Sequence, residues 1–400
     1  MTEAITYEPA ESAQVERFAA VAIAGERPYR ICARCVMDTS DRDITFDESG
    51  VCNHCHTFAE HAARRLMPMA ERTRELERVV GEMKAAGRGR EYDCILGVSG
   101  GVDSTYAAYL LRNLGLRVLA VHVDNGWNSE LAVFNIERVL RTLGIDLHTE
   151  VLDWEEFKDI QLSFLKASVP DGEIPTDHAI FAVMHSAPQR FGCRYVVNGV
   201  NSASEASLPI TWTYGVSDWT YIRAVQKRFG SVRLKSFPHF RLWAHYLKRV
   251  VRQYHSVPIL DLVDYRKEEA KRLLEKELGW RDYGGKHYES IYTRFFQGYI
   301  LPRKFGIDKR RSHLSSLICA GQMSRAAALE ELSNPPYDPV MQREDYEYVL
   351  KKFSLSAAEF DALMAIPPKT YEEYPNSLRH LPFLRVGARV ARRLGLLRRA

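Results

Sequence analysis

The sequence lacks the features that define several broad classes of protein. No apolar run reaches the roughly 18 residues that a membrane-spanning helix needs. The opening stretch, "MTEAITYEPAESAQ", has no basic region followed by an apolar one, so we do not expect a secretory signal. Repeats and low-complexity tracts are absent, and a net charge of +4 does not by itself indicate a nucleic-acid partner. We therefore expect a soluble, cytoplasmic protein.

The chain of 400 residues is longer than a single hydrophobic core usually organises. Composition and spacing predict five parts. These are a flexible N-terminus (1–28), a four-cysteine hairpin (29–57), a charged linking helix (58–90), a main domain (91–330) and a helical C-terminal region (331–400).

Cysteine is unevenly placed along the chain. Four of the seven cysteines form two C-x-x-C pairs with sixteen residues between them, whereas the other three are scattered. Zinc prefers four thiolates in a tetrahedron, and each C-x-x-C turn supplies two of them. The intervening stretch alternates apolar and polar residues before a "DESG" turn, which predicts a small β-hairpin. We predict that a structural zinc ion is held by Cys32, Cys35, Cys52 and Cys55.

The stretch "GVSGGVDSTYAAYLL" joins an apolar run to a helical pattern. Gly100 and Gly101 allow the backbone to approach a ligand, and Ser99, Ser104 and the start of the helix add affinity for an anion. A phosphate site is therefore predicted. The lysine that the loop of kinase-type NTPases requires is missing, so this is a different kind of phosphate loop.

Strand and helix patterns alternate after this loop. "LRVLAVHVDNGW" and "DLHTEVLDW" read as strands, and "PTDHAIFAVMHSAPQRFG" reads as a helix before the strand "CRYVVNGVN". This alternation predicts an α/β fold with a parallel sheet. Asp124 falls at the end of one strand, where a carboxylate suits a nucleotide site.

The S-G-G-V-D-S loop resembles the pyrophosphate loop of the ATP pyrophosphatases, the PP-loop group of the adenine-nucleotide alpha hydrolase-like fold. These enzymes cleave ATP to AMP and pyrophosphate and adenylate a substrate oxygen. The resemblance implies that Asp103 and Glu205 hold Mg²⁺ on the phosphates and that Asn201, in "NGVNSASE", contributes to nucleotide binding. Glu205 could instead cap or salt-bridge a helix start.

Longer motifs narrow the resemblance. "CARCVMDTSDRDITFDESGVCNHC", the loop, "PTDHAI", "NGVNSASE" and "YGGKHYESIYTRFFQGYILPRKFGIDKRRSHLSSLICAGQMSR" resemble the bacterial N-acetyl sugar amidotransferases of surface-polysaccharide (lipopolysaccharide, O-antigen) biosynthesis. The resemblance implies conversion of an acetamido group on a nucleotide-linked N-acetyl sugar into an acetamidino group, with ATP and ammonia. It also implies ammonia-supplying partner subunits similar to the glutaminase and cyclase halves of imidazole glycerol phosphate synthase, and no nucleic-acid partner.

Four further residues are candidates for the site. Lys286, after two glycines and before His287 and Glu289, could neutralise departing pyrophosphate, and Arg310, in a basic triplet, could bind the nucleotide. Asp177 and His178 could contact substrate. The alternatives are a solvated basic face for the triplet and a helix cap for Asp177.

Two segments leave other interpretations open. Residues 226–255 mix cations with aromatics, a texture of nucleic-acid surfaces, which keeps a PP-loop tRNA thiolase as an alternative. Such chemistry commonly needs paired catalytic cysteines, whereas the three spare cysteines lie far apart in sequence. A non-catalytic nucleotide-binding or scaffold protein is the second alternative. The C-terminal stretch "FLRVGARVARRLGLLRRA" reads as a basic amphipathic helix suited to peripheral contact with the inner membrane face or to packing on the body.

Overall fold

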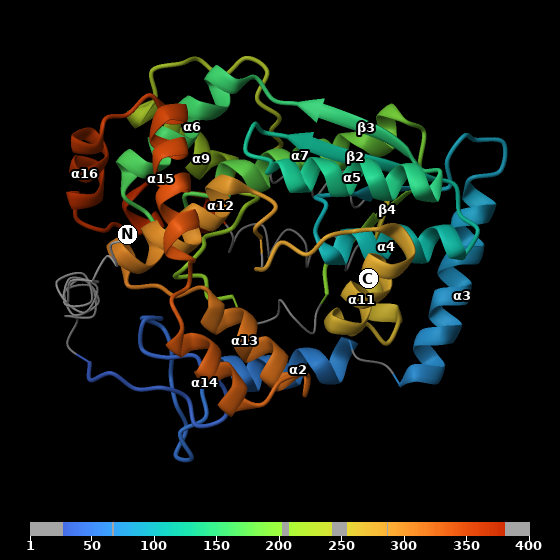
Figure 1. The fold of residues 1–400 in the computed structure, drawn as a ribbon, viewed down its shortest axis with the longest axis horizontal. Helices are drawn as coiled ribbons and strands as arrows, with labels where there is room; N and C mark the ends of the chain where they lie inside the picture. The colour runs from blue at the N-terminus through green and yellow to red at the C-terminus, as the bar shows by residue number, and fades with distance from the viewer. Residues whose placement is uncertain (1–26, 66–67, 202–207, 242–253, 286, 381–400) are drawn as a thin grey trace, which may run out of the picture. The chain divides into compact units, whose positions relative to one another are not determined.

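The computed structural model describes residues 27–65, 68–201, 208–241, 254–285 and 287–380 (Figure 1). The chain forms two compact units whose segments alternate along the sequence. The cysteine unit comprises residues 1–63, 203–212 and 292–368, and the sheet unit comprises residues 64–202, 213–291 and 369–400. The structure thus divides the chain differently from the sequence prediction, because the cysteine segment packs with helices from the C-terminal half.

A five-stranded parallel sheet forms the centre of the sheet unit, with the strand order β3-β2-β1-β4-β5. Its core strands are short apolar runs, as expected for a sheet covered on both faces. The predicted α/β class with a parallel sheet is confirmed. The strands are β1 (Cys94–Gly97), β2 (Val118–Asp124), β3 (Asp146–Val151), β4 (Tyr195–Asn198) and β5 (His255–Pro258).

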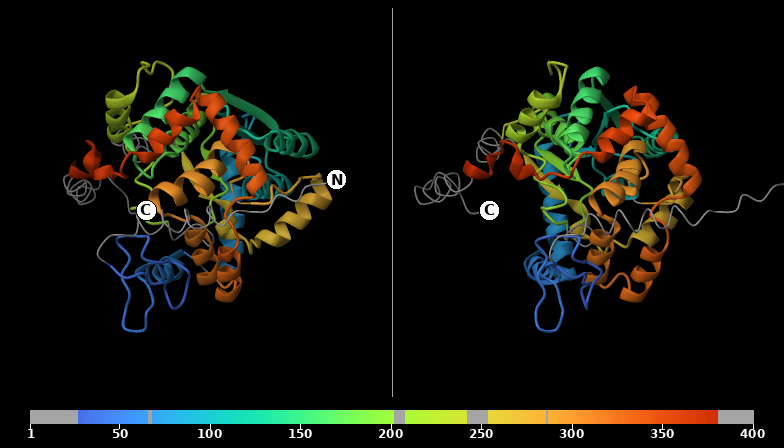
Figure 2. Two further views of the ribbon diagram at one scale, coloured as in Figure 1. Left: turned by 60° about the vertical axis from the view of Figure 1, so that its left-hand side comes forward. Right: turned by 90° about the vertical axis from the view of Figure 1, so that its left-hand side faces the viewer.

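Helices cover both faces of this sheet (Figure 1, Figure 2). On one face α3, α4, α5 and α11 enclose the larger hydrophobic core, and on the other α7 packs over Ile95, Leu119 and Val121. Helices α6 and α9 pack against each other beside α7. Their bounds are α3 (Met69–Ala86), α4 (Val102–Asn113), α5 (Glu130–Leu143), α6 (Trp154–Ala167), α7 (Ile174–Arg190), α9 (Trp219–Phe229) and α11 (Lys267–Leu278).

Local signals in the sequence fix where these helices begin and end. Ser129 and Asp153 cap α5 and α6 by accepting hydrogen bonds from backbone N–H groups of the first turn. Gly144 and Gly279 end α5 and α11 in the left-handed conformation that glycine adopts without strain. Short 3-10 turns complete the unit at Ile259–Leu262 (η1), Tyr371–Glu373 (η3) and Ser377–His380 (η4).

Strand order places the site. β1 lies between β2 and β4. The chain adds β2 and β3 on one side of β1 and then returns to add β4 and β5 on the other side, so the strand order reverses between β1 and β4. In open parallel sheets, ligands bind outside the carboxyl ends of the strands at such a change of order. The predicted phosphate loop, residues 98–104, follows β1 at this position.

The helices of the cysteine unit are held together by buried polar contacts. The Arg294 guanidinium donates to both carboxylate oxygens of Asp345, and the Lys304 ammonium donates to three carbonyls at the end of α16. The unit contains α2 (Asn53–Arg65), α12 (Ile291–Phe295), the π-helix η2 (Phe296–Phe305), α13 (Arg310–Cys319), α14 (Arg325–Ser333), α15 (Pro339–Phe353) and α16 (Ala357–Ala365), with α2 and α12 reaching the unit boundaries.

Two expectations differ from the structure. The single helix predicted over residues 58–90 is two helices, α2 and α3, and Pro68 stands at the N-cap of the second. The cysteine segment contains isolated antiparallel bridges, Ile31 with Asp38 and Phe46 with Cys52, in place of a β-hairpin. Strand β5 begins at His255, the last residue of the basic segment that the sequence analysis associated with nucleic-acid surfaces. Two of its four residues are exposed, so it lacks the apolar signature of a core strand.

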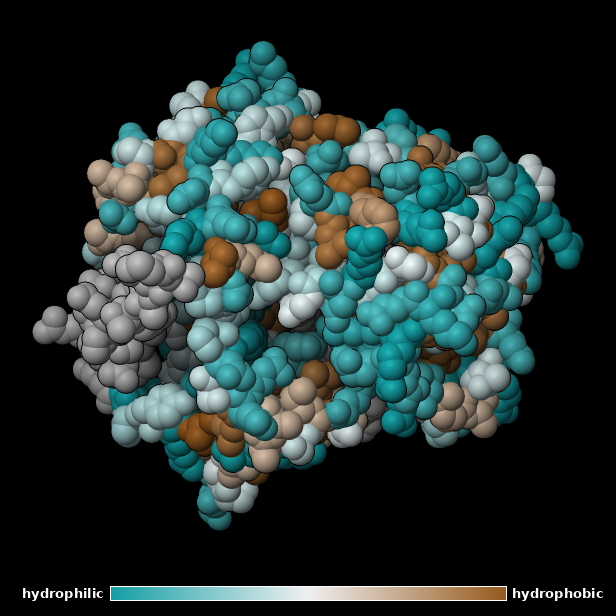
Figure 3. All heavy atoms as spheres, viewed as in Figure 1, coloured by the Kyte–Doolittle hydropathy of each residue, from teal (hydrophilic) through white to brown (hydrophobic). Residues whose placement is uncertain are grey.

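Within the described residues, no helix is long and apolar enough to cross a membrane. On the face drawn in Figure 3, hydrophobic residues lie scattered among hydrophilic ones. The predicted amphipathic helix at the C-terminus lies outside the described residues.

Candidate nucleotide and metal sites

The phosphate loop is shaped by Gly100. Its φ is +83°, and a Cβ there would lie 2.8 Å from the Tyr283 hydroxyl and 3.0 Å from the Ala132 carbonyl oxygen. Only glycine combines this backbone angle with so little space. The Gly100 carbonyl accepts hydrogen bonds of 2.9 Å from both Trp280 Nε1 and Tyr283 Oη, so a distant segment fixes the turn.

The other loop residues present donors to an anion. Gly101 is the N-cap of α4 and has no side chain that could cap the first-turn N–H groups. The Ser99 and Ser104 hydroxyls lie 3.4 Å apart, and Ser104 Oγ accepts from the Ser99 N–H and donates to the Gly101 carbonyl. These contacts of 3.2–3.4 Å are long enough to be exchanged for phosphate oxygens. The structure therefore brings the four predicted phosphate-binding residues together at the start of a helix.

Asp103 lies in the first turn of α4, and the Tyr265 hydroxyl donates a hydrogen bond to its Oδ1. This contact holds the carboxylate at the loop. The sequence analysis did not find Tyr265, because it follows the loop by 162 positions and carries no motif of its own.

The segment after β4 approaches the loop closely. A Cβ at Gly199 would lie 3.0 Å from the backbone nitrogen of Ser104 and 3.2 Å from the carbonyl carbon of Asp103. Asn201 is buried two residues further on, and its contact with the nucleotide stays a prediction. Glu205, the second predicted Mg²⁺ ligand, lies outside the described residues.

Asp124 ends β2 and is held in a small polar network. Its Oδ1 accepts from the Gly126 N–H at 2.9 Å and from Asn128 Nδ2 at 3.1 Å. Asn128 Nδ2 also lies 2.9 Å from His122 Nε2, while His122 Nδ1 lies 2.9 Å from the Val98 carbonyl oxygen. Because a carbonyl accepts only, the proton of His122 is on Nδ1, and the network connects the end of β2 to the start of the loop.

A segment far from the loop in sequence lies against it. We call residues 280–285 and 287–291 the strap. The strap contacts Gly100 through Trp280 and Tyr283, and Glu289 Oε1 lies 3.5 Å from the position that a Cβ on Gly101 would take. The sequence analysis named Glu289 only as a neighbour of Lys286, and Lys286 itself lies outside the described residues.

Asp177 lies in the first turn of α7 and His178 follows it, but the structure places His178 in the core. The ring is fully buried and stacked between aromatic neighbours, with the centroid of Phe240 at 4.6 Å. Nδ1 donates to the Val216 carbonyl at 2.7 Å, and Nε2 accepts from the Phe240 N–H. Burial lowers the pKa of His178 to about 4. A neutral, bonded ring favours a structural role over the predicted contact with substrate.

Arg310, predicted to bind the nucleotide, is engaged within the cysteine unit. Its Nε and Nη2 donate to the Asp308 carboxylate, and its Nη1 donates to the carbonyls of Glu331 and Asn334 at 3.0 Å. These contacts tie the start of α13 to the end of α14. Because they occupy the guanidinium, the structure favours a structural role for Arg310.

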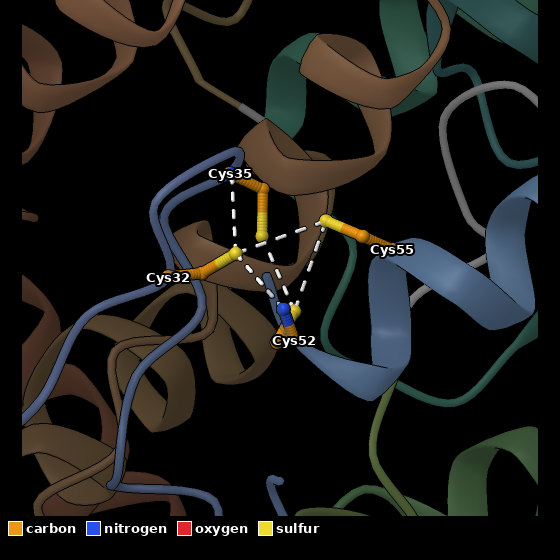
Figure 4. A group of neighbouring side chains, drawn as sticks. All are labelled: Cys32, Cys35, Cys52 and Cys55. Carbon is orange, nitrogen blue, oxygen red and sulfur yellow. Dashed lines mark hydrogen bonds between the residues drawn. The ribbon is translucent and has the colours of Figure 1, made fainter. Parts of the chain in front are cut away.

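The four cysteines of the two C-x-x-C pairs are buried and point toward one another (Figure 4). The Sγ atoms are 3.9 Å apart for Cys32 and Cys55, 3.6 Å for Cys35 and Cys52, and 3.8 Å for Cys52 and Cys55. A tetrahedron with Zn–S bonds of about 2.3 Å has edges of about 3.8 Å. The arrangement therefore fits a single tetrahedral Zn²⁺.

Backbone groups surround the sulfur of one of these cysteines. Cys32 Sγ accepts from three N–H groups, those of Arg34, Cys35 and Cys52, at 3.2–3.4 Å. Hydrogen bonds from the neighbouring thiols, that of Cys35 foremost, and from the backbone lower the pKa of Cys32. The Arg325 guanidinium also donates to the carbonyls of Cys32 and Cys35, which fixes the first turn from α14.

A fifth cysteine adjoins the four. Cys319 Sγ, at the end of α13, lies 3.7 Å from Cys55 Sγ but does not belong to the group of four mutually close sulfurs. Sequence reasoning could not associate Cys319 with this site, because 264 positions separate the two residues and Cys319 has no C-x-x-C partner. Hydrophobic contacts of Val36 with Leu314 and Ala328 hold the same helices against the cysteine segment.

Comparison with known proteins bears on the C-terminal half. Residues 289–386 match the family described as LPS biosynthesis protein WbpG-like, C-terminal domain. The chain carries a WbpG-like C-terminal domain. This match confirms the predicted resemblance to a family of surface-polysaccharide biosynthesis. The WbpG-like domain begins in the strap and includes η2 and the helices α13 to α16.

Several relatives are similar to parts of the sequence. An uncharacterized protein of Methanocaldococcus jannaschii is 23% identical over 333 residues, which covers 80% of this chain and 98% of the relative. The tRNA-specific 2-thiouridylase MnmA of Helicobacter hepaticus is 32% identical over 112 residues, 26% of this chain and 32% of the relative. The glutamine-hydrolyzing GMP synthase of Pyrobaculum aerophilum is 40% identical over 74 residues, 18% of this chain and 14% of the relative. The chain thus spans a third or less of these two enzymes.

Solved structures with a detectable likeness include two synthetases. NMN synthetase from Francisella tularensis is 16% identical, with a TM-score of 0.29, and the match covers 72% of this chain and 98% of that chain. The NH3-dependent NAD synthetase from Campylobacter jejuni is 14% identical, with a TM-score of 0.27, covering 64% and 98%. The strand order of the sheet and the loop after β1 establish the fold of this chain.

Proposed function

We propose that the protein is an ATP-dependent amidotransferase of surface-polysaccharide biosynthesis. Its substrate is a nucleotide-linked N-acetyl sugar, and its product carries an acetamidino group in place of the acetamido group. The observation that supports this most directly is a WbpG-like domain on a chain whose PP-loop lies at the carboxyl end of β1.

The chemistry needs two steps at one site. In the first step, the acetamido oxygen attacks the α-phosphorus of ATP, the bond to the β-phosphate oxygen breaks, and pyrophosphate leaves. In the second, ammonia adds to the imidate carbon, a proton is lost, and the carbon–oxygen bond to AMP breaks. Adenylation is required because an amide oxygen is otherwise a poor leaving group.

Residues of the loop serve the first step. The hydroxyls of Ser99 and Ser104 and the first-turn N–H groups of α4 hold the pyrophosphate portion in place as its charge increases. Asp103, fixed by Tyr265, is positioned to hold Mg²⁺, which neutralises phosphate charge when it is bound. Such catalysis depends on positioning and electrostatics, so small displacements of these groups have large effects on the rate.

A second candidate, tRNA thiolation, is favoured by the similarity to MnmA. Two of the three cysteines outside the C-x-x-C pairs argue against it. Cys94 and Cys193 are the cysteines of the sheet unit; both are buried, and burial raises the pKa of both thiols, that of Cys193 to about 11. Sulfur transfer requires an accessible thiolate, and neither group provides one at neutral pH.

The first experiment incubates the purified protein with ATP, Mg²⁺, ammonium and a panel of nucleotide-linked di-N-acetylated sugars. We expect AMP release that depends on the sugar, and a product lighter by the mass difference between an oxygen atom and an NH group. AMP release that depends on no sugar but requires bulk tRNA and a sulfur donor would overturn the amidotransferase proposal in favour of thiolation.

The variant Asp103→Ala tests the assignment of the site. We expect it to abolish sugar-dependent AMP release while its circular dichroism and thermal midpoint stay close to wild type, because the side chain lies in the first turn of α4 rather than in the core. The matched control, Glu137→Gln on the exposed face of α5, should retain full activity. An active Asp103→Ala variant would show that the loop is not the catalytic site.

The proposal extends to the supply of ammonia. Partner subunits similar to the glutaminase and cyclase halves of imidazole glycerol phosphate synthase would deliver it, and glutamine should replace ammonium in the assay only when such partners are added.

A further inference from the structure

Hydrogen bonds at both ends hold the strap to the rest of the sheet unit, beside the phosphate loop. At one end Trp280 and Tyr283 bond the Gly100 carbonyl. At the other, the Glu289 carbonyl accepts from the Ser129 N–H at 2.9 Å, and the Ile291 N–H donates to the Trp127 carbonyl at 2.9 Å. An antiparallel bridge between Asn128 and Ser290 lies between these two bonds.

This attachment places the Glu289 carboxylate beside Gly101, one of the residues predicted to bind phosphate. Glu289 Oε1 lies 3.5 Å, and its carboxyl carbon 3.7 Å, from the position of a Cβ on Gly101. The side chain is about one-fifth exposed and has His287 Nδ1 at 3.6 Å from Oε1.

An ionised carboxylate in this position repels the phosphates of ATP. ATP and Glu289 can occupy the site together when a cation lies between them, and Mg²⁺ is commonly bound by one or two carboxylates plus phosphate oxygens. We propose that Glu289, carried by the strap, is a divalent-cation ligand of the nucleotide site, in addition to Asp103. This inference rests on the proposed ATP-dependent function, since it concerns the same site.

An imidazolium is the competing explanation. If protonated His287 rather than a metal lies between Glu289 and the phosphates, the carboxylate serves to orient the ring. His287 has a φ of +63°, a conformation that is uncommon for a residue with a side chain. The two explanations differ in whether the effect of Glu289 depends on the metal.

The test measures ATP binding by calorimetry for wild type, Glu289→Gln and the control Glu137→Gln, with Mg²⁺ and with EDTA. Glutamine keeps the size of the side chain and removes its charge. With Mg²⁺, we expect Glu289→Gln to bind ATP about tenfold more weakly, the size of effect seen when support for a metal is lost. In EDTA we expect the reverse order, because the variant no longer repels the phosphates.

A spectroscopic measurement reports on the metal itself. Mn²⁺ replaces Mg²⁺, and its paramagnetic resonance spectrum in the ternary complex with ATP should differ between wild type and Glu289→Gln but not between wild type and Glu137→Gln. The readout requires no turnover and no sugar substrate.

The outcomes separate the two proposals. If wild type binds no ATP under any condition, the proposed function fails. If wild type binds Mg²⁺-ATP but Glu289→Gln weakens binding equally with Mg²⁺ and EDTA, or leaves it unchanged, the cation-ligand assignment is wrong while the function stands. If His287→Gln weakens metal-free ATP binding and Glu289→Gln does the same, the imidazolium explanation holds instead.

Discussion

Two adjacent glycines in the phosphate loop have different physical reasons to be glycine. Gly100 has a positive φ, and a Cβ there would lie within 3.3 Å of atoms of Tyr283, Ala132 and Ile136. Gly101 has an ordinary backbone angle of −66°, and a Cβ there would meet Ser99 Oγ at 3.3 Å and Glu289 at 3.5 Å. The first glycine is needed to form the loop, whereas the second leaves room for the ligand.

Alanine at each position should therefore act differently. We expect Gly100→Ala to lower the free energy of unfolding by about 2 kcal/mol, because it combines a strained backbone with a steric clash. Gly101→Ala should change it by less than about 0.5 kcal/mol but lower ATP affinity about tenfold, since its methyl group enters the phosphate site. Urea denaturation and calorimetry measure the two quantities, and equal effects of the two variants on stability would contradict this interpretation.

Among the elements, the cysteine segment depends on helices that come much later in the chain. Arg311 Nε lies 2.9 Å from the Asp38 carboxylate, and Ser315 Oγ accepts from the Val36 N–H. Together with Arg325, these contacts hold the first C-x-x-C turn from α13 and α14. Such support around the ligands fixes the geometry of a metal site.

Zinc content distinguishes the ligands from the adjoining thiol. Purified wild-type protein should contain a single Zn²⁺ per chain, and Cys35→Ser should lose it, because the four thiols form one closed tetrahedron. Cys319→Ser should retain the metal, since its sulfur lies close to Cys55 but outside the tetrahedron. Elemental analysis gives the stoichiometry. A loss of zinc in Cys319→Ser equal to that in Cys35→Ser would make Cys319 a ligand.

Stability of the whole molecule should depend on pH through His178. Its folded-state pKa of about 4 lies below the value of about 6.5 for an exposed histidine. Between these values the unfolded state binds more protons, so the stabilising effect is complete above pH 6.5 and is lost as the pH falls toward 4. Burial is the main cause; the nearby His239 acts in the same direction, and the Val216 carbonyl and Asp218 oppose it.

The variant His178→Gln isolates this contribution. Wild type should lose about 3 kcal/mol of unfolding free energy through this group between pH 7 and pH 4. The variant should be less stable at pH 7, because it loses the buried ring, and should show a shallower decline with acid. Chemical denaturation at several pH values provides the comparison, and parallel curves for the two proteins would exclude His178 as the source.

Several features of the fold follow from short stretches of sequence. The alternation of apolar runs with helical patterns predicted the parallel sheet, and the S-G-G-V-D-S loop falls after β1 as expected. The C-x-x-C spacing predicted the cysteine cluster, and Gly144 ends α5 as a glycine stop should. Each of these depends on neighbours within a few residues, which is the range over which capping, periodicity and metal-ligand spacing act.

Tertiary structure decided what surrounds these features. It placed Glu289 on Gly101, Tyr265 on Asp103 and Cys319 beside Cys55, and it moved His178 from a predicted contact with substrate into a stacked aromatic core. None of these neighbours has a local signature. The first three contacts join segments more than a hundred residues apart, and the burial of His178 depends on how several aromatic rings pack around it. The sequence by itself determined the loop and the four thiols; the packing of the chain determined which side chains lie beside them.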